Sequence, residues 1–153
     1  MEEWKKEFWK APTLLDTTNP DISAFRKNGG KLIILHGTAD RVLALSGTID
    51  YYNKFVEKFG QRPLNNFVKF YIVPGYGHGK ESVFTMGRNV LQDLDHWVVS
   101  KEEPGNLVVT DQNEKTKGRA LPLQVYPGYP RYSGNGNVNS AAIYVYGSLA
   151  NGR

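Results

Sequence analysis

The sequence contains no cysteine among its 153 residues. Disulfide bonds, thiolate metal sites and cysteine nucleophiles are therefore excluded. It also lacks any apolar run approaching the ~20 residues that a membrane-spanning helix needs, so we expect no membrane partner. The opening residues Met1 to Lys6 lack the apolar stretch of a signal peptide, which leaves the cellular compartment undetermined.

Charge of one sign is not concentrated in the sequence either. Nineteen Lys and Arg face fifteen Asp and Glu, a formal net charge of +4. The basic residues are scattered, apart from Lys5 with Lys6 and the stretch Lys115, Lys117 and Arg119. A nucleic-acid-binding surface would gather them on one face. We therefore expect a solvated surface of mixed charge and no nucleic-acid partner.

The length and the 40% content of hydrophobic residues are those of one globular domain over residues 1–153. Within it we distinguish an N-terminal extension (1–20), strand–helix units (21–103) and an irregular tail rich in Tyr, Pro and Gly (104–153). The tail contains short candidate strands at residues 107–109, 121–126 and 143–146.

The middle of the chain has the pattern of an α/β fold. Two apolar runs predict buried strands and two segments with helical spacing predict helices, in the order strand 31–37, helix 48–60, strand 67–73 and helix 90–100. Ser46 or Thr48 is the expected cap of the first helix. Connections of this length imply parallel strands. Two such strands leave two open sheet edges, so we expect the tail or a partner to cover them, or the chain to self-associate.

Two polar side chains follow the ends of the two predicted strands. The first strand runs into a loop that ends at Asp40, and the second runs into a glycine-rich loop that contains His78. Loops at the carboxyl ends of parallel strands converge over one crevice, so these side chains can approach each other. A carboxylate that orients an imidazole is what hydrolysis by an activated serine requires. Acid before histidine also fits the order of the α/β-hydrolase triad.

Simpler interpretations of these residues stay open. Asp40 can merely cap the turn that follows it, and His78 can be an ordinary loop residue. His36 is expected to be a strand-end residue bonded to backbone, and His96 a helix-surface residue. Three histidines so dispersed do not form a metal site. The tail tyrosines are expected to serve packing rather than recognition; they are Tyr126, Tyr129 and Tyr132.

Four ordered segments give a more specific indication. Residues 21–40, 47–52, 73–79 and 127–132 resemble, in this order, segments of the tannase and feruloyl esterase family of α/β-hydrolases. The resemblance covers roughly residues 16–146 and implies the C-terminal part of that fold. It implies that Asp40 is the triad acid and His78 the triad base. It further implies a phenolic acid ester, such as a ferulate or galloyl ester, as substrate, with no cofactor needed.

The same resemblance shows what this sequence lacks. Family members use a serine placed much earlier, are often secreted, and carry an inserted lid domain that binds calcium in some of them. None of that region is present here. Cysteines expected at Gly79, Gln124 and Val145 are absent, and no serine stands in a G-x-S-x-G elbow. The seven serines are Ser23, Ser46, Ser82, Ser100, Ser133, Ser140 and Ser148.

Two functional hypotheses follow from these residues. The first is a carboxylic ester hydrolase relative that is inactive alone, truncated before its serine region, and that acts on aromatic acid esters only if an upstream serine segment completes it. The second is a non-catalytic remnant or interaction module on the same scaffold. Loss of the nucleophile favours the second hypothesis, and retention of Asp40 and His78 favours the first.

Overall fold

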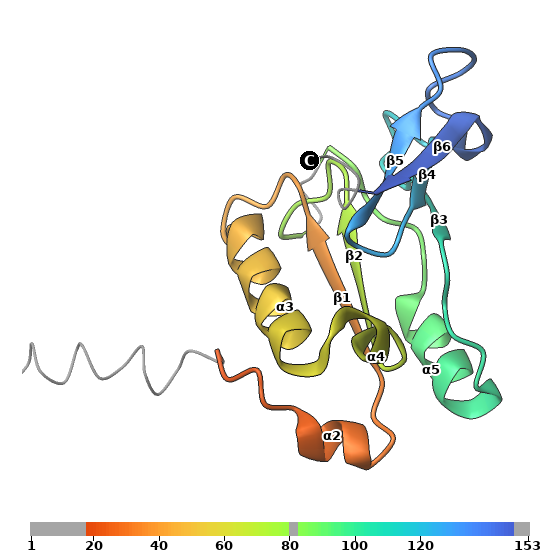
Figure 1. The fold of residues 1–153 in the computed structure, drawn as a ribbon. Helices are drawn as coiled ribbons and strands as arrows, with labels where there is room; N and C mark the ends of the chain where they lie inside the picture. Colours follow the sequence, from red (N-terminus) through yellow and green to blue (C-terminus); the bar gives the residue numbers. More distant parts are fainter. Residues whose placement is uncertain (1–17, 80–82, 149–153) are drawn as a thin grey trace, which may run out of the picture.

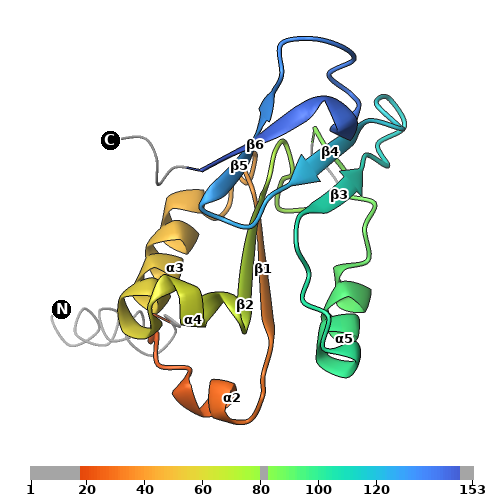
Figure 2. The ribbon, with the colours of Figure 1, turned by 45° about the vertical axis from the view of Figure 1, so that its right-hand side comes forward.

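Two parallel strands form the centre of the fold. The computed structural model describes residues 18–79 and 83–148, and most of the expected N-terminal extension lies outside these ranges. The strands β1 (Leu32–Gly37) and β2 (Val68–Val73) pair in parallel, as the sequence predicts. The helices α3 (Leu45–Phe59) and α5 (Val90–Ser100) lie on opposite sides of this pair (Figures 1 and 2). The expected α/β class is therefore confirmed.

Strand β2 is buried on both faces because its side chains alternate between two apolar clusters. Val68 and Phe70 pack on the side of α3, in a cluster that includes Tyr52. Tyr71 and Val73 point to the other side, toward the strands of the tail. All four of these β2 side chains are fully buried, which explains why this run is apolar without strict alternation.

Helix α3 begins earlier than expected and is not capped as expected. It starts at Leu45, with Ala44 before it, and neither Ser46 nor Thr48 makes a capping hydrogen bond, so the prediction of a hydroxyl cap is wrong. The helix ends before Gly60, as predicted. Two short helices complete this side; they are α2 (Ser23–Lys27) and α4 (Gln61–Asn65).

The tail forms two antiparallel strand pairs. Three of its strands match expected segments within a few residues, whereas β5 is not predicted from the sequence. Strand β3 (Leu107–Thr110) pairs with β4 (Ala120–Leu123), and β5 (Gly128–Tyr132) pairs with β6 (Tyr144–Ser148). A 3-10 turn at Ala141–Ile143 comes directly before β6. Pair β5–β6 lies beyond the carboxyl ends of β1 and β2 (Figures 1 and 2).

The tail also covers the outer edge of β2. Val125 forms an antiparallel bridge with Tyr71, and the Tyr126 backbone N–H donates to the Phe70 carbonyl at 2.8 Å. The expectation that tail residues cover an open edge is thus confirmed for β2. No strand within residues 18–79 and 83–148 pairs with the outer edge of β1. In the same ranges, no helix has the length and apolar character needed to traverse a bilayer.

Candidate active site

The loops that follow β1 and β2 are tied together by backbone contacts. The Gly75 N–H donates to the Thr38 hydroxyl at 2.9 Å, and the Ala39 N–H donates to the Tyr76 carbonyl at 3.0 Å. Gly37 makes this approach possible, because a Cβ there would lie 1.9 Å from the Tyr76 carbonyl oxygen. The two loops therefore hold one position relative to each other, and the side chains that they carry are positioned with them.

The Asp40 carboxylate bonds to both loops. Its Oδ2 lies 3.0 Å from Nδ1 of His78, so the contact expected from the sequence is present. Its Oδ1 accepts hydrogen bonds from the backbone N–H groups of Val42 at 2.8 Å and Leu43 at 2.9 Å. One oxygen of Asp40 therefore closes its own turn, and the other contacts the imidazole.

Exposure and charge differ between these two side chains. The Asp40 side chain is 9% exposed and that of His78 is 52% exposed. Hydrogen bonds from the Leu43 N–H, first, and from His78 lower the pKa of Asp40 to about 2, so the carboxyl group is ionised at neutral pH. An ionised carboxylate accepts the Nδ1 proton of His78, which leaves Nε2 as the basic nitrogen of a neutral imidazole. The exposed ring can then be reached by a reacting group.

A second histidine, His36, contacts the turn that follows Asp40. His36 is 8% exposed, and its Nδ1 lies 2.8 Å from the Thr48 hydroxyl while its Nε2 lies 3.2 Å from the Leu43 carbonyl. The same Nε2 lies 3.8 Å from Oδ2 of Asp40. The backbone contact of His36 was expected, but its partner Thr48 was not. A hydroxyl in the first turn of a helix suggests a cap, and nothing in the sequence indicates that a strand residue binds it instead.

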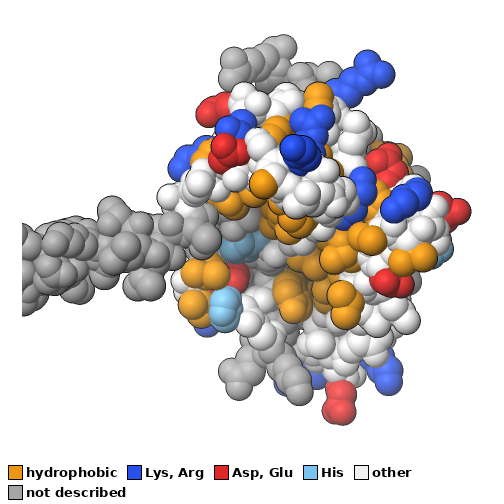
Figure 3. Space-filling view, turned by 90° about the horizontal axis from the view of Figure 1, so that it is seen from below, with side chains coloured by type: hydrophobic (Ala, Val, Ile, Leu, Met, Phe, Trp, Pro, Cys, Tyr) orange, Lys and Arg blue, Asp and Glu red, His pale blue; other side chains and the backbone are white. Residues whose placement is uncertain are grey.

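The turn after Asp40 also presents apolar side chains to solvent. Val42 is 68% exposed and Leu43 is 56% exposed, in the turn whose backbone N–H groups bond to Asp40. In Figure 3, apolar side chains gather across the middle of one face of the molecule. The larger exposed apolar side chains elsewhere include Leu91 and Val99 of α5. The surface thus contains more uncovered apolar area than scattered single residues would give.

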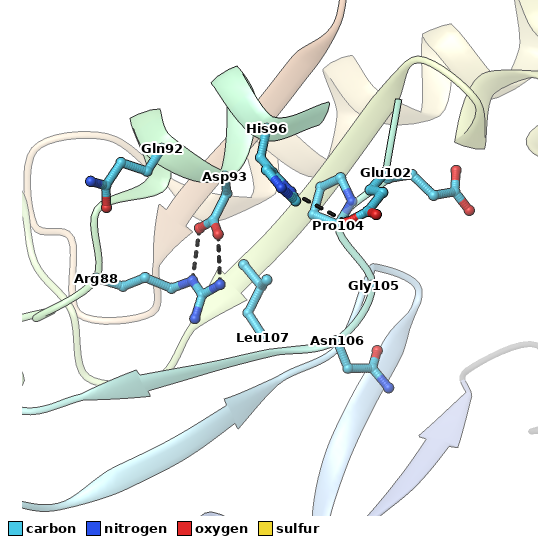
Figure 4. Close-up of a pocket in the computed structure, with 10 residues that line it drawn as sticks. Arg88, Gln92, Asp93, His96, Glu102, Pro104, Gly105, Asn106 and Leu107 are labelled. Carbon is cyan, nitrogen blue, oxygen red and sulfur yellow. Dashed lines mark hydrogen bonds and ion pairs between the residues drawn. The ribbon is translucent and has the colours of Figure 1, made fainter. Parts of the chain in front are cut away.

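A separate hollow of about 470 Å³ lies between α5 and residues 102–107, away from the strand ends (Figure 4). Most of its charged side chains are paired with one another: Arg88 bonds to Asp93 through two nitrogens, at 2.6 and 2.7 Å, and Nδ1 of His96 lies 3.6 Å from Glu102. His96 is a helix-surface residue, as expected. In the part of the chain that the structure describes, no group of three His, Cys, Asp or Glu residues could hold a metal ion.

A parallel α/β unit with an acid and a histidine at its strand ends has the arrangement of part of an α/β-hydrolase, and solved structures agree with that fold. Feruloyl esterase B from Aspergillus oryzae superimposes with a TM-score of 0.79 at 23% identity, covering 89% of this chain and 30% of that one. The tannin acyl hydrolase from Aspergillus niger superimposes with a TM-score of 0.74 at 22% identity, covering 96% and 27%.

The chain belongs to the tannase and feruloyl esterase family, whose sequence pattern matches residues 1–146. Among relatives, an uncharacterized esterase from Agrobacterium fabrum is 36% identical over 132 residues, covering 86% of this chain and 24% of that protein. Mono(2-hydroxyethyl) terephthalate hydrolase from Piscinibacter sakaiensis is 31% identical over 131 residues, covering 84% and 21%. The chain thus spans about a quarter of the length of these relatives. Its family places it among relatives of ester hydrolases.

Proposed function

We propose that this chain supplies the acid, Asp40, and the base, His78, of a serine ester hydrolase that acts on esters of phenolic acids. The observation that supports this most is the 3.0 Å contact between Oδ2 of Asp40 and Nδ1 of His78 at the joined carboxyl ends of two parallel strands. A partly buried, ionised carboxylate beside an exposed imidazole is the arrangement that activates a serine hydroxyl.

In the proposed reaction, His78 accepts the proton of a serine hydroxyl while the serine oxygen attacks the ester carbonyl carbon. The proton passes from His78 to the alcohol oxygen as the ester bond breaks, and an acyl-enzyme forms. A water molecule, deprotonated by His78 in the same way, then releases the acid and restores the serine. Asp40 keeps its negative charge throughout and stabilises the imidazolium. The serine comes from outside the 153 residues, which contain no G-x-S-x-G.

The first test concerns the chain alone. We expect the purified chain to show no hydrolysis of methyl ferulate or a p-nitrophenyl ester above the rate of its His78→Ala variant, because no nucleophile elbow is present. Serine-dependent turnover that disappears in His78→Ala would contradict the proposal that residues 1–153 are inactive by themselves.

The second test supplies the missing part. The chain is fused behind the segment of the Agrobacterium fabrum esterase that precedes its matching region, and methyl ferulate hydrolysis is measured. We expect activity that falls at least about a thousandfold in His78→Ala and strongly in Asp40→Asn. The exposed residues His96 and Asp50 provide matched controls, since His96→Ala and Asp50→Asn leave both loops intact. A folded fusion equally active with and without His78 would refute the assignment.

The absence of a nucleophile elbow favours a second candidate, a non-catalytic interaction module on the same scaffold. The two candidates differ in the fusion experiment. A module that has lost its chemistry gives a folded but inactive fusion in which changing Asp40 or His78 has no effect on rate. The proposed esterase half gives an active fusion that depends on both side chains.

A further inference from the structure

A polar side chain ends the row of residues that β1 turns toward α3. Alternate residues of a strand face the same side, and Leu32 and Ile34 pack in the apolar cluster on the α3 side. His36 is the next residue of this row, and it is only 8% exposed. A buried polar group is costly unless it is hydrogen-bonded. Both nitrogens of this ring therefore need partners, and those partners define what His36 can do.

The partners of the ring determine which of its nitrogens carries the proton. Nε2 lies 3.2 Å from the Leu43 carbonyl oxygen, which can only accept a hydrogen bond, so Nε2 carries the donating N–H. In a neutral ring Nδ1 is then an acceptor, and the Thr48 hydroxyl, 2.8 Å away on α3, donates to it. His36 thus directs one N–H group from the end of β1 toward the turn that follows Asp40.

This N–H group lies near the turn and the carboxylate at once. Leu43, whose carbonyl accepts from His36, donates its own N–H to Oδ1 of Asp40 at 2.9 Å. Nε2 of His36 also lies 3.8 Å from Oδ2 of Asp40, the oxygen that is 3.0 Å from Nδ1 of His78. Oδ2 therefore lies between two imidazoles, one buried and one exposed. His36 restrains this carboxylate through the turn on one oxygen and through its N–H dipole on the other.

We infer that His36 is a positioning residue: it holds Oδ2 of Asp40 against Nδ1 of His78 and so keeps the proton of the neutral His78 ring on Nδ1. The inference rests on the proposed function for its catalytic meaning, because Nε2 of His78 can accept a serine proton only while the ring proton is on Nδ1. A neutral His36 also leaves the negative charge of Asp40 to stabilise the imidazolium of His78. The position of the ring proton can be measured on the chain alone.

The experiment measures the ring nitrogen NMR shifts of the ¹⁵N-labelled chain, which distinguish a protonated from a bare imidazole nitrogen. At a pH where both rings are neutral, we expect the proton on Nδ1 of His78 and on Nε2 of His36. His36→Gln can place an amide N–H near the position of Nε2, whereas the shorter His36→Asn reaches only the position of Nδ1. The ratio of Nδ1–H to Nε2–H forms of His78 should fall about fivefold or more in His36→Asn and stay high in His36→Gln.

Two further variants separate positioning from stability. Val109→Ala opens a gap in the apolar cluster on the other side of β2, so it destabilises the fold away from His36 and should leave the tautomer ratio of His78 unchanged. Thr48→Val keeps the His36 ring but removes its hydroxyl donor, and should lower the ratio less than His36→Asn. An unchanged ratio in folded His36→Asn, or in Thr48→Val where only that variant folds, would overturn the inference. An equal fall in Val109→Ala would overturn it as well.

Rates in the fusion with the Agrobacterium fabrum segment give a second, separate readout. We expect His36→Asn to lower kcat about 10- to 100-fold with KM nearly unchanged, His36→Gln to restore most of the rate, and the exposed control His96→Ala to keep it. If the tautomer ratio responds while the fusion is inactive, the proposed function fails and the role of His36 beside Asp40 stands. If the fusion depends on His78 while His36→Asn changes neither the ratio nor kcat, the inference fails and the proposed function stands.

Discussion

Asp40 divides its carboxylate oxygens between two sets of partners. One oxygen accepts from the backbone of its own turn, at Val42 and Leu43, and the other accepts from His78. Asp40 therefore both contacts the imidazole of His78 and shapes the turn in which Asp40 itself lies. A change at Asp40 affects the geometry and the charge of the site together, so rate and stability must be measured side by side.

The pH dependence of stability should reflect the lowered pKa of Asp40. Its pKa in the fold is about 2, below the ordinary value of 3.8. A carboxyl group with a lowered pKa stabilises the fold fully above pH 3.8, and this contribution is lost as the pH falls toward 2. We expect the difference in unfolding midpoint between the unchanged chain and Asp40→Asn to be largest near neutral pH and to shrink between those two values.

Thermal unfolding over that pH range measures this difference. Asp50→Asn, at an exposed position of α3, provides the comparison, and its difference from the unchanged chain should not follow the same pH window. A difference for Asp40→Asn that stays constant down to pH 2 would mean that Asp40 does not titrate as described.

Thr48 should stabilise the fold through His36. Thr48→Val removes the hydroxyl beside Nδ1 of a buried histidine, and an unpaired buried polar group costs about 1–3 kcal/mol. Ser46→Ala removes another hydroxyl from the same first turn of α3, where it makes no capping bond, and should change stability by less than about 0.5 kcal/mol. Urea unfolding of both variants tests this, and equal effects would contradict it.

At the scale of elements, the approach of the two loops depends on one backbone position. Gly37→Ala would place a Cβ 1.9 Å from the Tyr76 carbonyl, and the backbone must move to relieve it. We expect a loss of at least about 2 kcal/mol and a weakened contact between Asp40 and His78. Gly47→Ala, in open space on α3, should instead stabilise by about 0.5–1 kcal/mol. Urea unfolding compares them, and similar losses in both would refute this role of Gly37.

The main strands and helices could be predicted because their apolar residues repeat with a clear period. Strand β1 and helix α5 match the expected segments almost residue for residue. Helix α4 was missed because it is a single short turn that contains Pro63. Strand β5 was missed because Gly128 and Pro130 are typical of turns, whereas here pairing with β6 decides the structure. Local propensity is overruled where tertiary pairing supplies the hydrogen bonds.

The candidate site could be predicted only in part. Asp40 and His78 follow predicted strands, and the geometry of parallel sheets brings such residues together. Thr38 and Thr48 could not be found in the same way, because the Thr38 hydroxyl bonds to a backbone N–H, that of Gly75, and Thr48 lies in the first turn of a helix. The bridge between Val125 and Tyr71 could not be predicted either, because no periodic pattern indicates how the tail lies against β2.

Across the whole molecule, β2 is more deeply buried than β1, although β2 contains a lysine and residues 32–35 of β1 are all aliphatic. Strand β2 carries Lys69, yet this side chain is only 5% exposed. The four aliphatic residues 32–35 of β1 are all only partly buried. The tail covers the outer edge of β2, whereas within the described residues no strand covers that of β1. An apolar strand with a free edge is a surface on which another strand can pair.

We therefore expect the isolated chain to self-associate through the free edge of β1. The average mass from light scattering should rise with protein concentration. Ile33→Lys places a charge on this edge strand and should shift the chain toward monomer, since lysine on an edge opposes pairing. Val108→Lys is the control, because Val108 is 45% exposed on β3 and lies off this edge. A monomeric mass at every concentration, with one cooperative melting transition, would show that residues 1–153 form a self-sufficient fold and that this edge needs no partner.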